Sequence, residues 1–289
     1  MLGSAVRTGL TKRNTAILQL VRGAASQEGQ LHWDPTKQLS KSEADRLEGG
    51  YAAIHFSGAN VTDRRWTSAY RTEIRASRVN STRSLATTLA SLRNPPQSLL
   101  VASAIGFYGD RGDEILTEDS SSGAGFLADM CRAWEAAAEP AVRAGIRIVH
   151  LRFGVILGPR HGALERMLPL FRLGLGGNLG NGRQWVSWIS LADAVAATLF
   201  ALDSASICGP VNLTSPNPVT NSQFTRALAR ELNRPAILTA PRLALKFAFG
   251  QMADELLLAS TRALPAKLQA AQFPFRCPKI EEALPAALR

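Results

Sequence analysis

Short apolar runs alternate with longer amphipathic segments along the first two thirds of the chain. The clearest run is Leu99–Ala102, which lies between Pro95-Pro96 and Gly106 and has the length of a strand buried on both faces. The same criteria predict four further strands and three helices. The strands are expected at 15–23, 52–60, 146–155 and 211–213, and the helices at 1–14, 67–92 and 126–144. Strands that alternate with helices indicate a parallel sheet covered by helices on both faces.

The pattern changes after about Asn217, where Pro-punctuated helices replace the alternation. Helices are predicted at 221–232, 241–249 and 252–260. We therefore expect a nucleotide-binding α/β domain over residues 1–216 and a small, mostly helical domain on the substrate side over residues 217–289.

Composition narrows the class of protein. With 289 residues, 46% hydrophobic and 19% charged, the chain has an ordinary globular composition. No apolar run approaches the roughly 18 residues of a membrane span, so no membrane association is expected. The three cysteines are far apart and lack a metal-binding spacing, so we expect no metal site, no disulfide framework and a cytoplasmic protein.

The net charge of +10 raises the question of an anionic partner. The basic residues are mostly Arg and are scattered, and no basic run is interleaved with aromatic residues. Nucleic acid is therefore not a predicted partner. Attraction for a phosphorylated cofactor, together with the amino-acid usage of a GC-rich genome, is the favoured interpretation.

Several segments together resemble a known family. They are WTSAYRTEIRASRVNST (66–82), ASAIGFYGDRGDEILTEDS (102–120), GFLADMCRAWEAAA (125–138), the stretch from LRFGVILGP to SLADA (151–194), and RALPAKLQAAQFPFRCPKIEEAL (262–284). In this order they are similar to the atypical short-chain dehydrogenase/reductases called NAD-dependent epimerase-like proteins. The resemblance implies a Rossmann-type doubly wound parallel sheet, a small helical C-terminal domain, and NADP-dependent oxidoreductase or epimerase chemistry on a small molecule.

The first departure from that family lies at the N-terminus. The family begins with a strand and a G-x-x-G-x-x-G turn that receives the cofactor pyrophosphate. Here the chain starts at Met1, and Gly3 matches the third glycine. Either the start is misplaced or the chain has been shortened, or the phosphate loop has been lost in the natural protein. As written, the chain is expected to bind dinucleotide weakly.

The second departure is catalytic. Active relatives use a Ser or Thr at the end of the 99–102 strand and a Tyr-x-x-x-Lys pair on the next helix. These positions fall on Ala104, Leu127 and Cys131, none of which can replace the family's residue. The catalytic residues are therefore unknown. Ser103, Tyr108 and Cys131 remain weak candidates, against a packing role for the tyrosine and a buried, inert role for the thiol.

Cofactor and substrate contacts are predicted from the same resemblance. Arg22 follows the second strand, where a cation can meet the 2′-phosphate and no acid is present, so NADP is expected rather than NAD. The full set expected along the cofactor is Gly3, Arg22, Ser57, Gly58, Ala59, Ser103, Ala104, Cys131, Phe153, Gly154 and Val155. The substrate-facing set is Tyr108, Arg172, Gln184 and Trp185, with Arg183 as a further cation; a surface loop with solvated arginines is the alternative. Asp193 matches the family's W-I-H-x-x-D aspartate, although Ser190 replaces the His.

Two functions of different classes follow. The first is an NADP-dependent oxidoreductase or epimerase that works by an altered mechanism. The second is a non-catalytic NADP(H)-binding sensor or scaffold, which the missing acid/base residues favour. The Gly-rich, Trp-bearing loop at 172–188 favours the enzyme, because a sensor has little need of it.

Overall fold

A four-stranded parallel sheet forms the centre of the molecule. The computed structural model describes residues 1–159 and 162–288. The sheet has the order β11-β6-β4-β3, and every neighbouring pair is parallel. Its strands are β3 (Ala52–His55), β4 (Ser98–Ala104), β6 (Arg147–Phe153) and β11 (Gly209–Leu213). All residues of β4 except Ala104 are buried, which confirms the predicted central strand.

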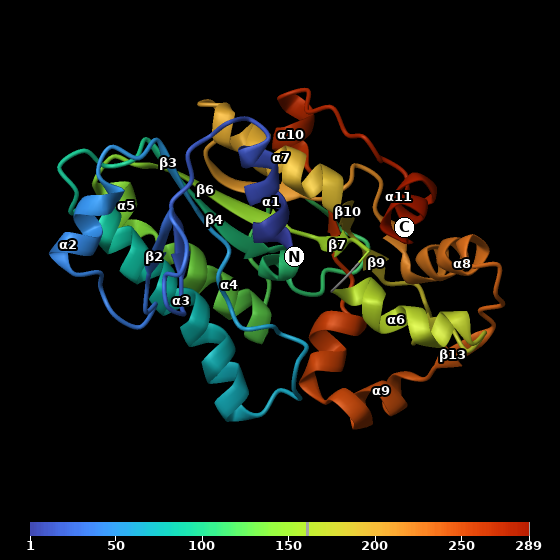
Figure 1. Cartoon of the computed structure of the whole chain (residues 1–289). Helices are drawn as coiled ribbons and strands as arrows, with labels where there is room; N and C mark the ends of the chain where they lie inside the picture. Colours follow the sequence, from blue (N-terminus) through green and yellow to red (C-terminus); the bar gives the residue numbers. More distant parts are fainter. Residues whose placement is uncertain (160–161, 289) are drawn as a thin grey trace.

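Helices cover both faces of this sheet (Figure 1). One face carries α3 (Ser68–Ala90), α4 (Phe126–Ala136) and α5 (Glu139–Arg143), and the other carries α1 (Leu2–Thr11) and α7 (Leu191–Asp203). Their buried apolar side chains form one core with the strands, including Ile74, Leu99 and Val149. The predicted doubly wound, Rossmann-type architecture is confirmed.

Two predicted elements are broken in the structure. The helix expected over 126–144 is two helices, because Pro140 lies in the first turn of α5 and cannot continue the hydrogen bonding of α4. The strand expected over 146–155 stops at Phe153. After Gly154 the chain enters β7 (Val155–Leu157), which pairs with β10 (Trp188–Ser190) outside the main sheet.

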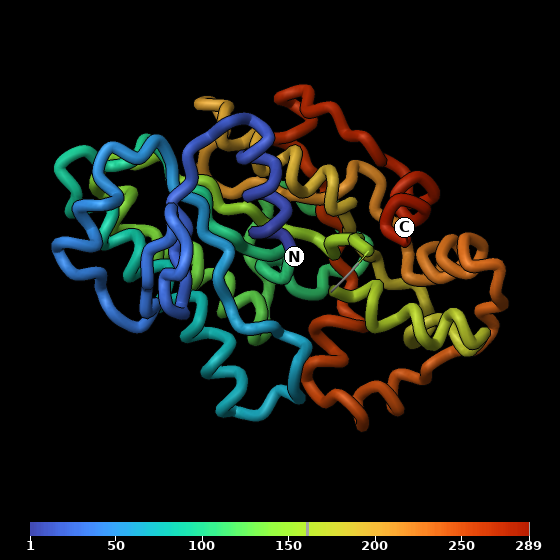
Figure 2. Tube along the Cα trace, in the orientation of Figure 1, coloured from blue at the N-terminus to red at the C-terminus, as the bar shows by residue number. Residues whose placement is uncertain are grey.

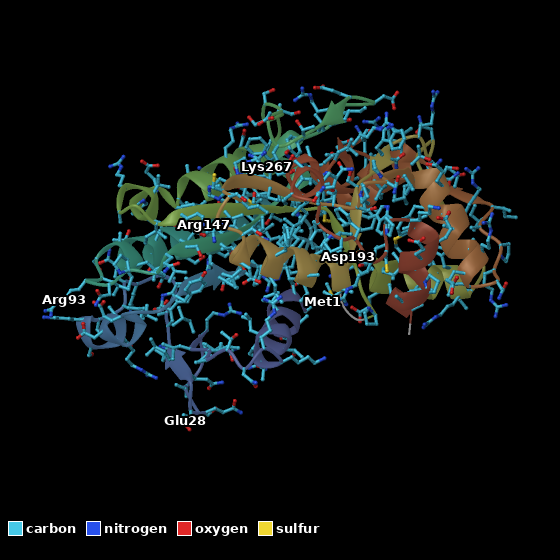
Figure 3. The ribbon with its side chains drawn as sticks, turned by 90° about the horizontal axis from the view of Figure 1, so that it is seen from above. Met1, Glu28, Arg93, Arg147, Asp193 and Lys267 are labelled. Carbon is cyan, nitrogen blue, oxygen red and sulfur yellow. The ribbon has the colours of Figure 1, made fainter. Side chains whose placement is uncertain are left out.

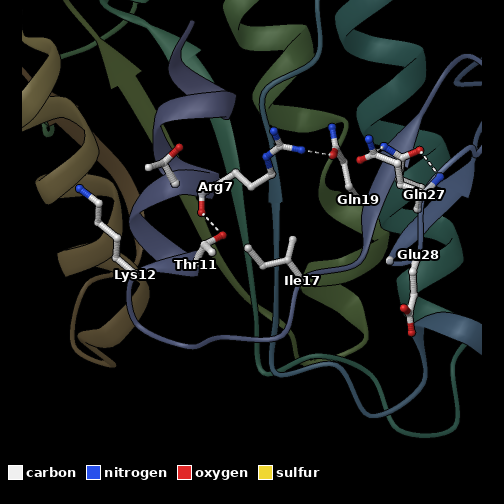
Figure 4. A pocket seen from close by; sticks show the side chains of 10 residues that line it. Arg7, Thr11, Lys12, Ile17, Gln19, Gln27 and Glu28 are labelled. Carbon is white, nitrogen blue, oxygen red and sulfur yellow. Dashed lines mark hydrogen bonds between the residues drawn. The ribbon is translucent and has the colours of Figure 1, made fainter.

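The strand predicted over 15–23 is short and lies outside the main sheet. Its ordered part is β1 (Gln19–Val21), which pairs in parallel only with β2 (Gln30–His32). Figure 4 shows the hollow between α1 and this pair, about 350 Å³ in volume, with Arg7 donating a hydrogen bond to Gln19 across it. Within the described chain, no strand joins the β1–β2 pair to β3, the edge strand of the main sheet.

Strand pairings connect the part of the chain before residue 217 to the part after it. Three small sheets each join a strand before residue 217 to one after it. They pair β8 (Gly177–Leu179) with β13 (Leu238–Ala240), β9 (Trp185–Val186) with β12 (Val219–Thr220), and β5 (Ile115–Leu116) with β14 (Arg262–Ala263). Figure 2 shows the red end of the chain returning from the bottom of the view to the top before it ends at the right.

A second apolar core lies beneath these pairings. Its members come from α6 (Ala163–Arg172), α8 (Asn221–Glu231) and α11 (Ile280–Leu288), packed around Trp188. The predicted helical character after residue 217 is present, but this core also takes residues from 155–188. The remaining short elements are α2 (Lys41–Ala44), η1 (Asp45–Leu47), η2 (Ile105–Tyr108), α9 (Arg242–Phe249), η3 (Ala253–Leu257) and α10 (Ala266–Ala270).

The helix predicted over 252–260 ends early, at Leu257, and most of it is the single π-turn η3. No helix within residues 1–159 and 162–288 is long and apolar enough to cross a membrane.

Candidate functional site

The carboxyl ends of β3, β4 and β6 meet at one edge of the sheet, where ligands bind in doubly wound folds. The register places Ala104 beside Phe153 at this edge. The ring of Phe56, just after β3, lies 6.2 Å from that of Phe153, centroid to centroid. A Cβ added at Gly3, in the first turn of α1, would lie 3.7 Å from the Phe56 ring. The structure thus brings Gly3, Ala104 and Phe153 to one edge, although they are predicted from three distant segments.

An arginine that sequence reasoning missed lies beside this edge. A Cβ added at Gly58 would lie 3.0 Å from Cζ of Arg78, which extends from α3. The Arg78 guanidinium sits 5.1 Å from the ring centroid of Trp134 and donates a hydrogen bond to the Ile74 carbonyl. Its buried Nε has no partner in the described part of the chain, and burial lowers the pKa of the guanidinium.

An arginine with a buried, unpaired donor is costly in an empty site. An anion at the wall formed by Ser57, Gly58 and Ala59 would pair with it. The residues present therefore fit a phosphorylated cofactor. Arg78 lies in the 66–82 segment, one of the segments that carry the family resemblance. Its place in that segment was the one signal in the sequence that could have identified it as a cofactor residue.

Two further predicted cofactor residues are explained by packing. A Cβ at Gly154 would lie 2.6 Å from the Ser187 carbonyl oxygen and 3.0 Å from Thr214. Gly154 is therefore required for close approach of protein backbone, and this packing replaces the predicted cofactor approach as its explanation. Val155 is occupied in the β7–β10 pairing opposite Trp188. Arg22 is exposed at the end of β1, where a charged ligand can reach it.

The catalytic candidate Ser103 belongs to a buried ion-pair network. Its hydroxyl donates to Oε1 of Glu135 at 2.7 Å. Arg152 binds the same carboxylate through Nε and Nη2, both at 2.8 Å, and its residue is only 3% exposed. Glu135 extends from α4 and Arg152 from β6, so the pair joins a helix to the sheet. Sequence reasoning did not single out either residue.

Tyr108 is a structural residue in this arrangement. Its side chain is fully buried. The hydroxyl donates to Oδ1 of Asn212 at 2.7 Å and accepts from Nη1 of Arg152 at 3.0 Å. Burial raises the pKa of the phenol. The placement does not support the predicted contact with substrate, because no part of the ring or hydroxyl is accessible.

Cys131 is likewise closed off. It is fully buried, its Sγ lies 3.7 Å from the Ala104 carbonyl oxygen, and burial raises its pKa to about 12. The thiol stays protonated at neutral pH and cannot supply a cation or a nucleophile. Leu127, at the position of the family's tyrosine, packs against Gly106.

The substrate-facing residues are only partly brought together. Gln184 is 7% exposed, and its amide nitrogen donates to the carbonyls of Leu179 and Leu257, which makes its role structural. The Trp185 indole donates to Asp113 at 2.7 Å. Arg172 lies at the far end of α6, where its carbonyl accepts a hydrogen bond from Arg234.

A cavity of about 620 Å³ lies beside Gln184 and is lined by Arg183 rather than Arg172. It opens between the turn that follows η2 and the turn that follows β8. Within the described ranges, no group of three His, Cys, Asp or Glu residues could hold a metal ion.

Asp193 connects the two cores. It is 1% exposed, and its carboxylate accepts from the Ser190 hydroxyl and from the backbone N–H groups of Arg276 and Cys277. Figure 3 shows Asp193 in the interior between the two halves of the ribbon. Its position in the family motif is explained by this structural link.

Comparison with known proteins agrees with this geometry. The model of the NAD-dependent epimerase/dehydratase family matches residues 1–213, and a domain of unknown function (DUF1731) matches residues 240–287. An epimerase family protein of Mycobacterium bovis is 42% identical over 284 residues, covering 98% of this chain and 93% of the relative. One from Bacillus subtilis is 35% identical over 286 residues, covering 98% and 93%.

A solved structure has the same fold. The crystal structure of the human epimerase family protein SDR39U1 with NADPH superposes with a TM-score of 0.89 at 26% identity, covering 100% of this chain and 96% of that one. The family match covers most of the chain, and the sheet and its helical layers agree with it. This chain belongs to the NAD-dependent epimerase/dehydratase family.

Proposed function

We propose that the protein binds NADP(H) across the carboxyl ends of β3, β4 and β6 and acts as an oxidoreductase or epimerase on a small molecule. The observation that carries this proposal is the unpaired Nε of Arg78 beside Gly58. A guanidinium in that position needs an anion, and a dinucleotide supplies one. The NADPH in the human relative's structure supports the choice of cofactor.

Three groups would hold the cofactor. The first backbone N–H groups of α1, at Gly3, have no partner within the helix and favour a phosphate. Arg78 provides charge at the wall of small residues after β3. Arg22, at the end of β1, would contact the 2′-phosphate, which favours NADP over NAD.

The chain's own residues position the reaction rather than carry protons. When bound, the nicotinamide supplies hydride exchange. The Cys131 thiol contacts the carbonyl of Ala104 at the end of β4. The ion pair of Arg152 with Glu135, and its hydrogen bond to Tyr108, hold the neighbouring side chains in place. Since none of these offers a free acid, the proton would pass to or from water or the substrate itself.

A non-catalytic NADP(H) sensor is the second candidate. It is favoured by the buried state of Cys131 and by the lack of a polar side chain at Ala104 and Leu127. A sensor needs the cofactor contacts but no proton relay. Side chains that cannot transfer a proton at these three positions would therefore not impair it.

Cofactor titration tests the proposal. Quenching of tryptophan fluorescence would be measured with NADPH and NADH for wild type, Arg78→Gln, Arg22→Gln and the control Arg75→Gln, an exposed residue of the same helix α3. Loss of the Arg78 charge should reduce the binding affinity for both dinucleotides by about tenfold or more. Arg22→Gln should weaken NADPH alone, and Arg75→Gln should change neither.

Wild-type protein that binds neither dinucleotide would refute the proposal. Dinucleotide binding with no change in NADPH absorbance across a metabolite pool would instead select the sensor.

A further inference from the structure

The 620 Å³ cavity has its own set of lining residues. They come from the turns at 110–113 and 180–184, from Arg242, and from the segment 258–260. None of the predicted cofactor residues lines it. Its volume suits a small metabolite, and its walls come from both halves of the molecule, as is common for ligand sites. Only η2 and Gly109 separate Asp110 from the strand that ends at Ala104.

Two carboxylates are fixed in one wall of this cavity. Oδ1 of Asp110 accepts from the backbone N–H groups of Ser260 at 3.1 Å and Gly112 at 3.3 Å. Oδ1 of Asp113 accepts from the Trp185 indole at 2.7 Å. Within residues 1–159 and 162–288, the second oxygen of each carboxylate makes no hydrogen bond. Each can therefore accept a hydrogen bond from a ligand hydroxyl without giving up its protein partner.

One cation faces the same cavity without a partner. The backbone N–H of Arg183 donates to Oδ1 of Asn181 at 3.0 Å, and Gly182 has a φ of +71°, so a tight turn sets the direction of the side chain. No hydrogen bond or ion pair to the Arg183 guanidinium occurs in the described ranges. Arg242, the other arginine of the lining, is already paired with Asp254 at 3.2 Å. Arg183 is thus the cation available to a ligand.

These groups define what the cavity can recognise. A free guanidinium binds a carboxylate through two parallel, charge-assisted hydrogen bonds, which are stronger than those it can make to a neutral hydroxyl. Two anchored carboxylates accept from hydroxyls and repel a ligand whose charge lies on their side. The complementary molecule carries one carboxylate at one end and hydroxyl groups along the rest.

We infer that this cavity binds a small hydroxylated carboxylate, with its carboxylate on Arg183 and its hydroxyls on Asp110 and Asp113. That such a ligand is the substrate rests on the proposed function, in which the C–H of a hydroxyl-bearing carbon would give its hydride to the nicotinamide as the hydroxyl becomes a carbonyl and releases its proton. The binding itself does not depend on NADP(H).

Three probes of equal chain length separate the contributions. Gluconate carries the carboxylate and the hydroxyls, sorbitol carries only hydroxyls, and hexanoate carries only the carboxylate. Saturation-transfer NMR titration of the full chain without cofactor should rank gluconate above both others by about tenfold. Hexanoate that binds as well as gluconate, or wild-type protein that binds none of the three, would overturn the inference.

Substitutions assign the contacts. Arg183→Gln should reduce gluconate binding to the level of sorbitol and leave sorbitol unchanged. Asp110→Asn should reduce the difference in binding affinity between gluconate and hexanoate, because it weakens the contact to the gluconate hydroxyls. Arg226→Gln, an exposed arginine of α8 with the same loss of charge, is the matched control and should bind gluconate as the wild type does. Unchanged gluconate binding in Arg183→Gln would refute the assignment.

The two proposals fail separately. Protein that binds gluconate as described but no dinucleotide would keep this site and reject the proposed function. Protein that binds NADPH but none of the probes would do the reverse.

Discussion

At the scale of single residues, the sheet edge is dominated by a buried charge pair. Arg152 and Glu135 expose only 4% and 12% of their side chains, and their ion pair holds Ser103 and Tyr108 in place. The Phe107 ring lies 3.5 Å from the Arg152 guanidinium carbon and shields it from water. Taking both charges out of water is costly, so the pair is stable only while both partners are present.

Removal of one partner should therefore be severe. Glu135→Ala is expected to cost about 4 kcal/mol of unfolding free energy, because Arg152 is left buried and unpaired. Urea denaturation would measure it. The exposed pair Asp129–Arg132 on the same helix provides the control, and Asp129→Ala should cost less than about 1 kcal/mol. A Glu135→Ala loss as small as the control's would show that the pair is not buried in solution.

The thiols should react in an order set by burial. Cys208 is exposed, Cys277 is half-buried, and Cys131 is buried with a pKa of about 12. An aromatic disulfide reagent at neutral pH should modify Cys208 first and Cys131 only after denaturant is added. Cys208→Ser should remove the fast phase. Rapid modification of Cys131 in native protein would contradict its placement.

Two histidines, the buried His55 and the half-buried His150, make stability depend on pH. Burial lowers the pKa of His55 to about 4 and lowers that of His150 in the same direction. Their neutral forms are stabilised by the fold, so this stability is present above pH 6.5, where the unfolded side chains are also neutral. It is lost as the pH falls from 6.5 toward about 4, and full loss for His55 amounts to about 3 kcal/mol.

Unfolding free energies from pH 7.5 to 4.5 would test this dependence. His55→Gln should flatten the pH dependence, at the cost of the hydrogen bond to Ser81. The exposed His32→Gln is the matched control and should follow the wild type. If the unfolding free energy of His55→Gln fell with pH as steeply as that of the wild type, groups other than His55 would be responsible for the pH dependence.

At the scale of elements, single carboxylates connect segments that lie far apart in sequence. Glu255 of η3 accepts from the first N–H groups of α4, at Phe126 and Leu127, and so caps a helix from the C-terminal part of the chain. Asp193, in the first turn of α7, accepts hydrogen bonds from the backbone N–H groups of Arg276 and Cys277, which lie just before α11. The Asp193 contacts link the first core to the segment that leads into the second, and the Glu255 contacts tie the C-terminal part of the chain to the first core.

Asp193→Asn should cost about 3 kcal/mol, because whichever way the new amide is turned, its N–H₂ would face one of the two backbone N–H groups, at Arg276 or Cys277, in a buried place. Limited proteolysis should then cut after residue 270 earlier than in the wild type. Asp203→Asn, at the end of the same helix, breaks an exposed ion pair with Arg13 and should cost less than about 1 kcal/mol. Equal losses for the two variants would argue against a special role for Asp193.

Element boundaries show where sequence reasoning was sufficient. The run Leu99–Ala102 was enough to predict β4, because a short, continuous apolar run between chain breakers is typical of a buried strand. The break at Gly154 was not predicted, since it depends on the Ser187 carbonyl that approaches it from a segment far along the chain. The same holds for Arg78, whose role depends on Gly58 and Trp134.

At the scale of the whole molecule, stability is concentrated in the four-stranded sheet. β4 and β6 are paired on both sides and buried, whereas β1 and β2 pair only with each other. Amide hydrogen exchange should be slowest in β4 and β6 and orders of magnitude faster in β1 and β2. Equal protection in the two sheets would show that the β1–β2 pair is joined to the main sheet in solution.

The sequence by itself determined the alternation of strands and helices, and its resemblance to known sequences predicted the family and placed Ala104, Leu127 and Cys131 where relatives carry the proton relay. The alternation is carried by local spacing, and the resemblance by the identity of residues in motifs along the chain. Only the tertiary structure decided that Tyr108 and Cys131 are sealed, that Glu135 pairs with Arg152, and that Arg183 rather than Arg172 faces a cavity. Burial and pairing depend on which distant segments meet, and periodicity along one chain does not contain that information.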